Sequence, residues 1–223
     1  MKISAIFVLM ALSVVSCKKD KSTIRTPKFK NIVILGNSIT FSAPDLNGEW
    51  KGSWGMAASA ADSDYVHLLT ARFKVIDSNC KVTARNITGF EKDYVNFNFD
   101  GNLKDLRDSV PDLLILRIGE NVQPFTYNAE TFKARYIALI DYFIAKNGKL
   151  SVLGVGPLWN AYLVEPVMKG QPYVSLARIN QDKSNTAYGL FTDPGIQIHP
   201  SNKGMRAISD AIWSGLEKLK PVE

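Results

Sequence analysis

Short apolar runs alternate with amphipathic stretches along most of the chain. The runs at 32–35 and 113–116 contain only apolar residues, which is typical of strands buried on both faces of a parallel sheet. The stretch at 129–146 instead carries apolar residues three or four positions apart, which is typical of a helix with one face on a core. The same patterns predict strands at 31–35, 81–87, 112–118, 149–155 and near 190, and helices at 64–73, 101–109, 129–146, 173–187 and 201–218.

The alternation of strands and helices predicts an α/β fold. Parallel strands need long crossover connections, and helices in these connections cover both faces of the sheet. We therefore expect a three-layer α/β/α sandwich built on a doubly wound parallel sheet. About 195 residues follow the amino-terminal segment, which is enough for one such domain and too few for two.

The amino-terminal segment differs in composition from the rest of the chain. Lys2 is followed by a mainly apolar stretch at 5–15, which is too short for a stable transmembrane helix. The sequence Val14-Val15-Ser16-Cys17 resembles the lipobox of a bacterial lipoprotein signal peptide. This resemblance implies cleavage before Cys17, lipidation of its thiol and anchoring in the bacterial cell envelope, whereas ordinary secretion would leave the thiol free. We expect a signal peptide at 1–16, a polar tether at 17–29 and a folded domain at 30–223.

Charge and cysteine content exclude some classes of function. The chain has 27 basic and 21 acidic residues, a net charge of +6, and its basic residues are scattered outside the tether. Such scattering argues against a nucleic-acid partner. If Cys17 is lipidated, the second cysteine, Cys80, has no intrachain partner, and it lies in neither a metal-binding nor a nucleophile pattern. We expect no metal ion and no cofactor.

The strand predicted at 31–35 ends abruptly in the sequence Gly36-Asn37-Ser38-Ile39-Thr40. A turn at the carboxyl end of a buried strand holds a serine on a rigid element, exposes its hydroxyl and places backbone N–H groups beside it. Ser38 is therefore the best candidate for a nucleophile. In the alternative interpretation, Gly36 and Asn37 only form a turn, and Ser38 caps the next helix.

One of the two histidines, His199, suits the role of a general base. Pro200 fixes the approach to the helix predicted at 201–218, and Ser201 suits its N-cap, so His199 lies in the loop before this helix. The other histidine, His67, lies within a predicted helix. We interpret His67 as a packed or surface residue.

Two further strand ends carry groups that can bind an oxyanion. The strand at 112–118 leads into Gly119-Glu120-Asn121, so the side-chain amide of Asn121 lies at the edge of the sheet where ligands of open α/β sheets bind. The strand at 81–87 ends at Thr88-Gly89-Phe90, where a glycine lets its backbone N–H approach a substrate oxygen closely. Taken alone, Gly89 indicates only a turn.

In chain order, a strand followed by Gly-Asn-Ser, a glycine turn, Gly-x-Asn and a late His-Pro resemble the motifs of the SGNH (GDSL-like) hydrolase family. The resemblance covers 32–219 and implies the fold expected above. It also implies an ester hydrolase in which Ser38 is the nucleophile and His199 is the base. The implied oxyanion donors are the N–H groups of Ser38 and Gly89 and the side-chain amide of Asn121.

The chain departs from the family pattern at one position. The family usually has an aspartate three residues before the histidine, and this chain has Ile196 there. Asp193 is the nearest carboxylate along the chain, and the following Pro194-Gly195 can bend the loop so that Asp193 orients His199. Otherwise a backbone carbonyl or a water molecule holds the Nδ1 proton and leaves a Ser-His dyad, or the site has lost its chemistry.

Three tryptophans near the candidate nucleophile bear on the substrate. Trp50 and Trp54 lie in a long glycine-rich segment after Ser38, and Trp159 follows the strand predicted at 149–155. A tryptophan offers a flat face and a polar N–H to a sugar ring, but it can equally plug a loop onto the core. We expect hydrolysis of O-acetyl groups on carbohydrate. The alternatives are a lipid esterase or thioesterase, and a non-catalytic glycan-binding lipoprotein of the same fold.

Overall fold

The structure, a computed structural model, describes residues 28–219. Its strands form a parallel sheet with the order β2-β1-β3-β4-β5, in which β1 and β3 lie side by side between other strands. This sheet confirms the predicted α/β class. The strands are β1 (Asn31–Gly36), β2 (Lys81–Asn86), β3 (Leu113–Arg117), β4 (Ser151–Val155) and β5 (Tyr173–Val174).

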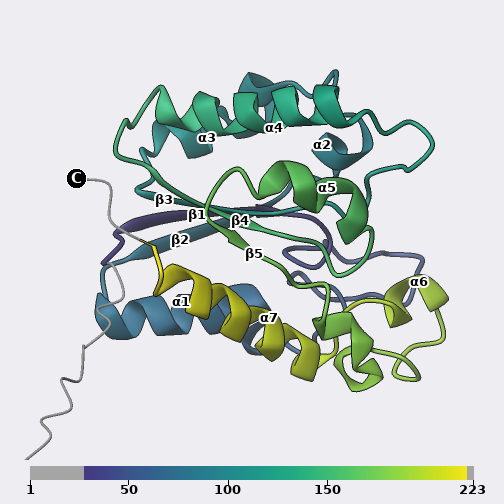
Figure 1. Cartoon of the computed structure of the whole chain (residues 1–223). Helices are drawn as coiled ribbons and strands as arrows, with labels where there is room; N and C mark the ends of the chain where they lie inside the picture. The colour runs from purple at the N-terminus through teal and green to yellow at the C-terminus, as the bar shows by residue number, and fades with distance from the viewer. Residues whose placement is uncertain (1–27, 220–223) are drawn as a thin grey trace, which may run out of the picture.

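Helices cover both faces of the sheet and complete the predicted three layers (Figure 1). One face is covered by α1 (Tyr65–Ile76) and α7 (Asn202–Leu216). The other face is covered by α2 (Thr88–Lys92), α3 (Phe99–Asp108), α4 (Ala129–Ile144) and α5 (Ala161–Met168). The connections hold the short helix α6 (Pro194–Gln197) and the 3-10 turns η1 (Ala61–Ser63), η2 (Ile179–Gln181) and η3 (Lys183–Asn185).

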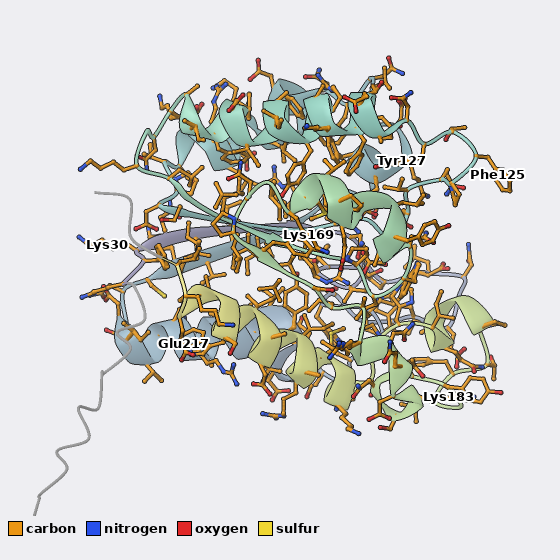
Figure 2. All side chains as sticks on the ribbon, in the orientation of Figure 1. Lys30, Phe125, Tyr127, Lys169, Lys183 and Glu217 are labelled. Carbon is orange, nitrogen blue, oxygen red and sulfur yellow. The ribbon has the colours of Figure 1, made fainter. Side chains whose placement is uncertain are left out.

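The sheet separates two hydrophobic cores because successive strand residues point to opposite faces. Ile32 and Ile34 pack on the side of α1 and α7, whereas Val33 and Leu35 pack on the side of α3 and α4. All four are fully buried, and full burial of one such side chain contributes roughly 1.5–3 kcal/mol. Figure 2 shows side chains filling the space between the sheet and both helical layers. Phe29 packs in the first core, one residue before the domain boundary expected at 30.

The prediction of a helix at 173–187 is wrong. In its place, β5 joins the edge of the sheet, and the two 3-10 turns η2 and η3 follow it. The N–H of Gly154 donates to the carbonyl of Pro172, and the N–H of Gly156 donates to the carbonyl of Val174, both over 2.8 Å. These main-chain bonds to the sheet override the local helical pattern.

Three short helices and one turn also differ from the prediction. Residues 188–190 form a turn where a short strand was expected. The helices α2, α5 and α6 were not predicted, and α5 contains Pro166, which lacks the N–H that a helix interior uses. These elements lie in the connections after the strands, so they shape the carboxyl edge of the sheet.

Within residues 28–219, no helix is long and apolar enough to cross a membrane. The signal peptide predicted at 1–16, the lipidation site Cys17 and most of the predicted tether lie outside the described residues. They remain expectations from the sequence.

Candidate active site

The residues that the sequence singled out come together at the carboxyl edge of the sheet. Ser38 follows β1, Gly89 lies in α2 directly after β2, and Asn121 follows β3. The connection after β1 leads to α1 on one face, and the connection after β3 leads to α4 on the other (Figure 1). Such a divergence between neighbouring strands opens a crevice at the strand ends, which is the usual ligand site of doubly wound sheets.

The turn after β1 requires a glycine at position 36. A Cβ atom on Gly36 would lie 1.8 Å from Oγ1 of Thr40 and 2.9 Å from the carbonyl oxygen of Arg117. This close approach lets the chain fold back, and the N–H of Thr40 donates to the carbonyl of Asn37 over 2.9 Å. The turn leaves Ser38 half-buried at the strand end.

The hydroxyl of Ser38 contacts the imidazole of His199. Ser38 Oγ lies 2.7 Å from His199 Nε2, although 161 residues separate them in the chain. His199 Nδ1 lies 2.8 Å from the carbonyl oxygen of Gly195. A carbonyl oxygen can only accept a hydrogen bond, so Nδ1 carries the proton and Nε2 of the neutral ring accepts the Ser38 hydroxyl.

The environment of His199 favours this neutral form. The side chain is buried, and burial lowers the pKa of His199, while the carbonyl of Gly195 and the negative charge of Glu120 oppose the shift. A neutral imidazole in contact with a serine hydroxyl is the arrangement that general-base catalysis requires.

The structure corrects the expectation that Asp193 orients His199. The carboxylate of Asp193 accepts the N–H of Gly195 over 2.6 Å and caps α6, and its side chain is exposed. The Nδ1 partner is the carbonyl of Gly195, which was one of the alternatives that the sequence left open. Ile196, at the position of the family's aspartate, packs in an apolar cluster with Trp50.

A second carboxylate holds the loop that carries the histidine. Glu49, from the segment after Ser38, accepts the N–H of Thr192 over 2.8 Å, its hydroxyl over 3.0 Å and the N–H of Asp193 over 2.9 Å. These contacts, foremost the N–H of Asp193, hold the pKa of Glu49 below its usual range. Glu49 therefore supports the geometry of His199 indirectly, through α6.

Two of the predicted oxyanion donors, Ser38 and Gly89, have backbone N–H groups that a ligand can use. Within residues 28–219, no acceptor bonds to the backbone N–H of Ser38 or of Gly89. A Cβ atom on Gly89 would meet only the ring of Phe97, at 3.6 Å, which is an ordinary contact. The fold itself therefore does not require glycine at position 89. Close approach of a ligand to the backbone N–H of this exposed residue would require it.

The sequence prediction missed a buried polar network beneath the site. Asn37 donates to Glu91 over 3.0 Å and to Glu120 over 2.6 Å, and its oxygen accepts from Arg117 over 3.1 Å. Arg117 also pairs with Glu120, and Glu91 binds Asn121. An arginine in an otherwise apolar strand, with a glutamate three residues later, is a signal that predicts a buried ion pair.

The three tryptophans have different surroundings. Trp50 is only 4% exposed, and its ring packs edge-on against Trp54 with a centroid separation of 5.7 Å. The indole N–H of Trp54 donates to the carbonyl of Ala58 over 2.8 Å. Trp50 and Trp54 thus fix the loop onto the core, and the burial of Trp50 corrects its assignment to a sugar pocket. Trp54 is half-buried, and its assignment to that pocket stays a prediction. Trp159 is half-buried, and its ring centroid lies 6.1 Å from that of His199.

Within residues 28–219, no group of three or more His, Cys, Asp and Glu side chains is arranged to hold a metal ion. Cys80 is buried and not in a disulfide, and burial raises the pKa of its thiol. His67 lies on α1, half-exposed, with Nδ1 2.9 Å from the carboxylate of Asp64. Neither residue takes part in the candidate site.

No family model matches the sequence, and no curated protein matches it. Several solved structures match the fold. A protein from Parabacteroides merdae named as a GDSL-like lipase is 18% identical, with a TM-score of 0.58, and the match covers 88% of this chain and 99% of that one. A two-domain esterase active on acetylated mannans is 19% identical, with a TM-score of 0.54, covering 87% of this chain and 53% of that one. A family 3 carbohydrate esterase from Talaromyces cellulolyticus is 14% identical, with a TM-score of 0.51, covering 86% and 100%.

These similarities concern the architecture, because the sequence identities are low. The parallel sheet, its strand order and the helices on both faces extend over almost all the described residues. The chain has the α/β fold of the GDSL-like (SGNH) hydrolases.

Proposed function

We propose that the protein is a serine ester hydrolase in which Ser38 attacks the ester carbonyl and His199 is the general base. The contact of 2.7 Å between Ser38 Oγ and His199 Nε2 is the observation on which this proposal rests. A hydrogen bond of this length allows direct proton transfer. The similarity of the fold to esterases supports this reaction class.

The reaction proceeds through an acyl-enzyme. His199 Nε2 takes the hydroxyl proton as Ser38 Oγ bonds to the carbonyl carbon, and the charge on the carbonyl oxygen is stabilised by the N–H groups of Ser38 and Gly89 and the amide of Asn121. The imidazolium then protonates the leaving alcohol as the ester C–O bond breaks. Water attacks the acyl group, His199 again takes the proton, and the carboxylic acid leaves as Ser38 is restored.

The carbonyl of Gly195 takes the place of the triad carboxylate. It fixes the tautomer of His199, as a carboxylate would, but it offers only a partial negative charge to the imidazolium. The carboxylate of Glu49 supports α6, the helix that carries Gly195, through its hydrogen bonds to Thr192 and Asp193. We therefore expect a working enzyme whose kcat is lower than that of a full triad.

O-acetyl groups on carbohydrate are the substrate we favour. The fold similarity to an esterase active on acetylated mannans and to a family 3 carbohydrate esterase supports a carbohydrate ester. Trp159 supplies an aromatic surface beside His199. The similarity to a protein named as a GDSL-like lipase favours a lipid ester as the second candidate.

Two measurements test this proposal. Labelling with a fluorophosphonate, followed by peptide mass spectrometry, should modify Ser38 and no other serine. Acetate release from acetylated oligosaccharides and a series of nitrophenyl esters of increasing chain length should show preference for acetyl. A rate that rises with chain length would favour a lipid esterase or thioesterase. Oligosaccharide binding without labelling or turnover would favour a glycan-binding protein.

The location of the protein is a separate part of the proposal. The lipobox-like sequence supports a lipid anchor on Cys17 and a place in the bacterial cell envelope. Expression of the full chain in bacteria fed labelled palmitate tests this. The wild-type protein should carry label and sediment with membranes, and the variant Cys17→Ser should do neither. An unlabelled wild-type protein would contradict the anchor.

A further inference from the structure

Glu91 has no part in the mechanism above, yet its side chain is fully buried at the site. One carboxylate oxygen accepts the side-chain amide of Asn37 over 3.0 Å and the N–H of Gly119 over 2.5 Å. The other accepts both the backbone N–H of Asn121, over 3.1 Å, and its side-chain amide. Four N–H donors suit an ionised carboxylate, because a protonated carboxyl would give up an acceptor position.

These contacts connect Glu91 to every segment that holds a predicted oxyanion donor. Asn37 directly precedes Ser38 in the turn after β1. Glu91 lies two residues after Gly89 in the same short helix, α2. Asn121, after β3, is held through both its backbone and its side chain. One side chain therefore joins the ends of β1, β2 and β3.

The neighbouring charges indicate that Glu91 does not serve as a simple ion-pair partner. Arg117 pairs with Glu120, three residues later, and makes no hydrogen bond to Glu91 among the described residues. Asn37 lies between the two carboxylates and donates to both. A second buried carboxylate beside Glu120 costs stability, so its presence is better explained by what it positions.

We infer that Glu91 is the positioning residue of the oxyanion hole: its carboxylate holds one hydrogen of the Asn121 amide so that the other is aimed at the oxyanion. This inference rests on the proposed ester hydrolysis. Preorganised donors stabilise the transition state without reorganisation, and a freely rotating amide would lose that advantage.

Protonation of Glu91 should disturb the site. Burial and, after it, the negative charge of Glu120 raise the pKa of Glu91 to about 7. Among residues 28–219, the other titratable or charged groups near this cluster are Arg117, with Tyr65 against its guanidinium, His199 and Tyr173. Because the protonated carboxyl loses an acceptor position, kcat should fall as the pH falls through the pKa of Glu91.

The kinetic test compares the wild-type protein with Glu91→Gln, Asn121→Ala and the double variant. We expect kcat of Glu91→Gln to fall about 10²–10³-fold with KM within about threefold, as for loss of one oxyanion donor. The double variant should be no slower than Asn121→Ala, because Glu91 acts through Asn121. An unchanged kcat in Glu91→Gln, or losses that multiply in the double variant, would overturn the inference.

A matched control comes from the amino-terminal end of the strands, opposite the candidate site. The carboxylate of Asp112 accepts the N–H groups of Lys30 and Asn31, over 2.8 and 3.0 Å, and Lys30 marks that end in Figure 2. Asp112→Asn removes a carboxylate that also binds backbone N–H groups, so it should keep the kcat of the wild type. A fall equal to that of Glu91→Gln would show that loss of any such carboxylate lowers activity.

A second measurement needs neither turnover nor a folded variant. In NMR spectra of the wild-type protein, one side-chain hydrogen of Asn121 should exchange slowly with solvent and the other should exchange fast. Fast exchange of both would overturn the inference even if Glu91→Gln fails to fold. Absence of hydrolysis that depends on Ser38 would refute the proposed function instead, and the exchange measurement would still decide whether Glu91 holds Asn121.

Discussion

The Nδ1 atom of His199 donates its hydrogen bond to the carbonyl oxygen of Gly195, 2.8 Å away and four residues earlier in the chain. The histidine is therefore oriented by the backbone of α6, and the helix itself is capped by Asp193. A dipole from a peptide group thus stands where a Ser-His-Asp triad has a charged side chain. The first prediction follows from this difference.

Asp193→Asn should change activity little. Asparagine caps a helix about as well as aspartate does, so α6 and the carbonyl of Gly195 should keep their places. We expect kcat/KM for nitrophenyl acetate within about threefold of the wild type, whereas loss of an orienting triad carboxylate costs roughly 10⁴-fold. A loss of that size in a folded Asp193→Asn variant would restore Asp193 as the third member of a triad.

Glu49→Gln should loosen the loop that precedes His199. The neutral amide offers one acceptor oxygen in place of the two that bind Thr192 and Asp193, so α6 gains freedom. We expect kcat to fall about 3–30-fold, a loss of positioning rather than of a reacting group. Asp45→Asn is the control, because within residues 28–219 the Asp45 carboxylate accepts one hydrogen bond, from the nearby N–H of Asn47. Equal rates for both variants would show that the Glu49 contacts do not support catalysis.

Lowering the pH should reduce kcat/KM in two steps. Protonation of Glu91, whose pKa burial raises to about 7, should give a partial loss, and protonation of His199 should abolish activity. Because burial lowers the pKa of His199, the second step should lie below 6.5, and the stability contributed by its neutral form should be lost over the same range. Glu91→Gln should retain only the lower step. A single step above 6.5 in both proteins would contradict this.

Arg117→Leu should destabilise the fold strongly. Arg117 and Glu120 form a fully buried ion pair, and removal of the guanidinium leaves Glu120 as an unpaired buried charge close to the carboxylate of Glu91. We expect the free energy of unfolding in urea to fall by about 3–5 kcal/mol. Lys104→Met removes the exposed partner of Asp108 and should leave the urea midpoint nearly unchanged. A stable Arg117→Leu protein would show that the network tolerates its uncompensated charge.

The sequence was informative where the signal is local. The apolar run at 32–35 with its glycine turn predicted both β1 and the placement of Ser38, and the helix starting after Ser201 predicted the loop that holds His199. The helix at 173–187 was wrong because pairing with β4 decides the conformation there, and that pairing depends on residues distant in the sequence.

The contacts that hold the site residues in place could not be predicted for a similar reason. Glu49 meets Thr192 across 143 positions of sequence, and Gly195 acts through a carbonyl that every residue possesses. Glu91 lies only two residues after Gly89, but nothing in the local pattern shows that its side chain turns inward. Arg117 was the one available signal, because an arginine within a buried strand requires an acidic partner.

The contact between Ser38 and His199 is tested most directly by ester hydrolysis with Ser38→Ala and His199→Ala beside the wild-type protein. If these side chains form the nucleophile and its base, each variant should lose at least about 10³-fold in kcat for nitrophenyl acetate while circular dichroism and the thermal midpoint stay close to the wild type. Hydrolysis that persists at the wild-type rate in a folded Ser38→Ala variant would contradict the proposed mechanism.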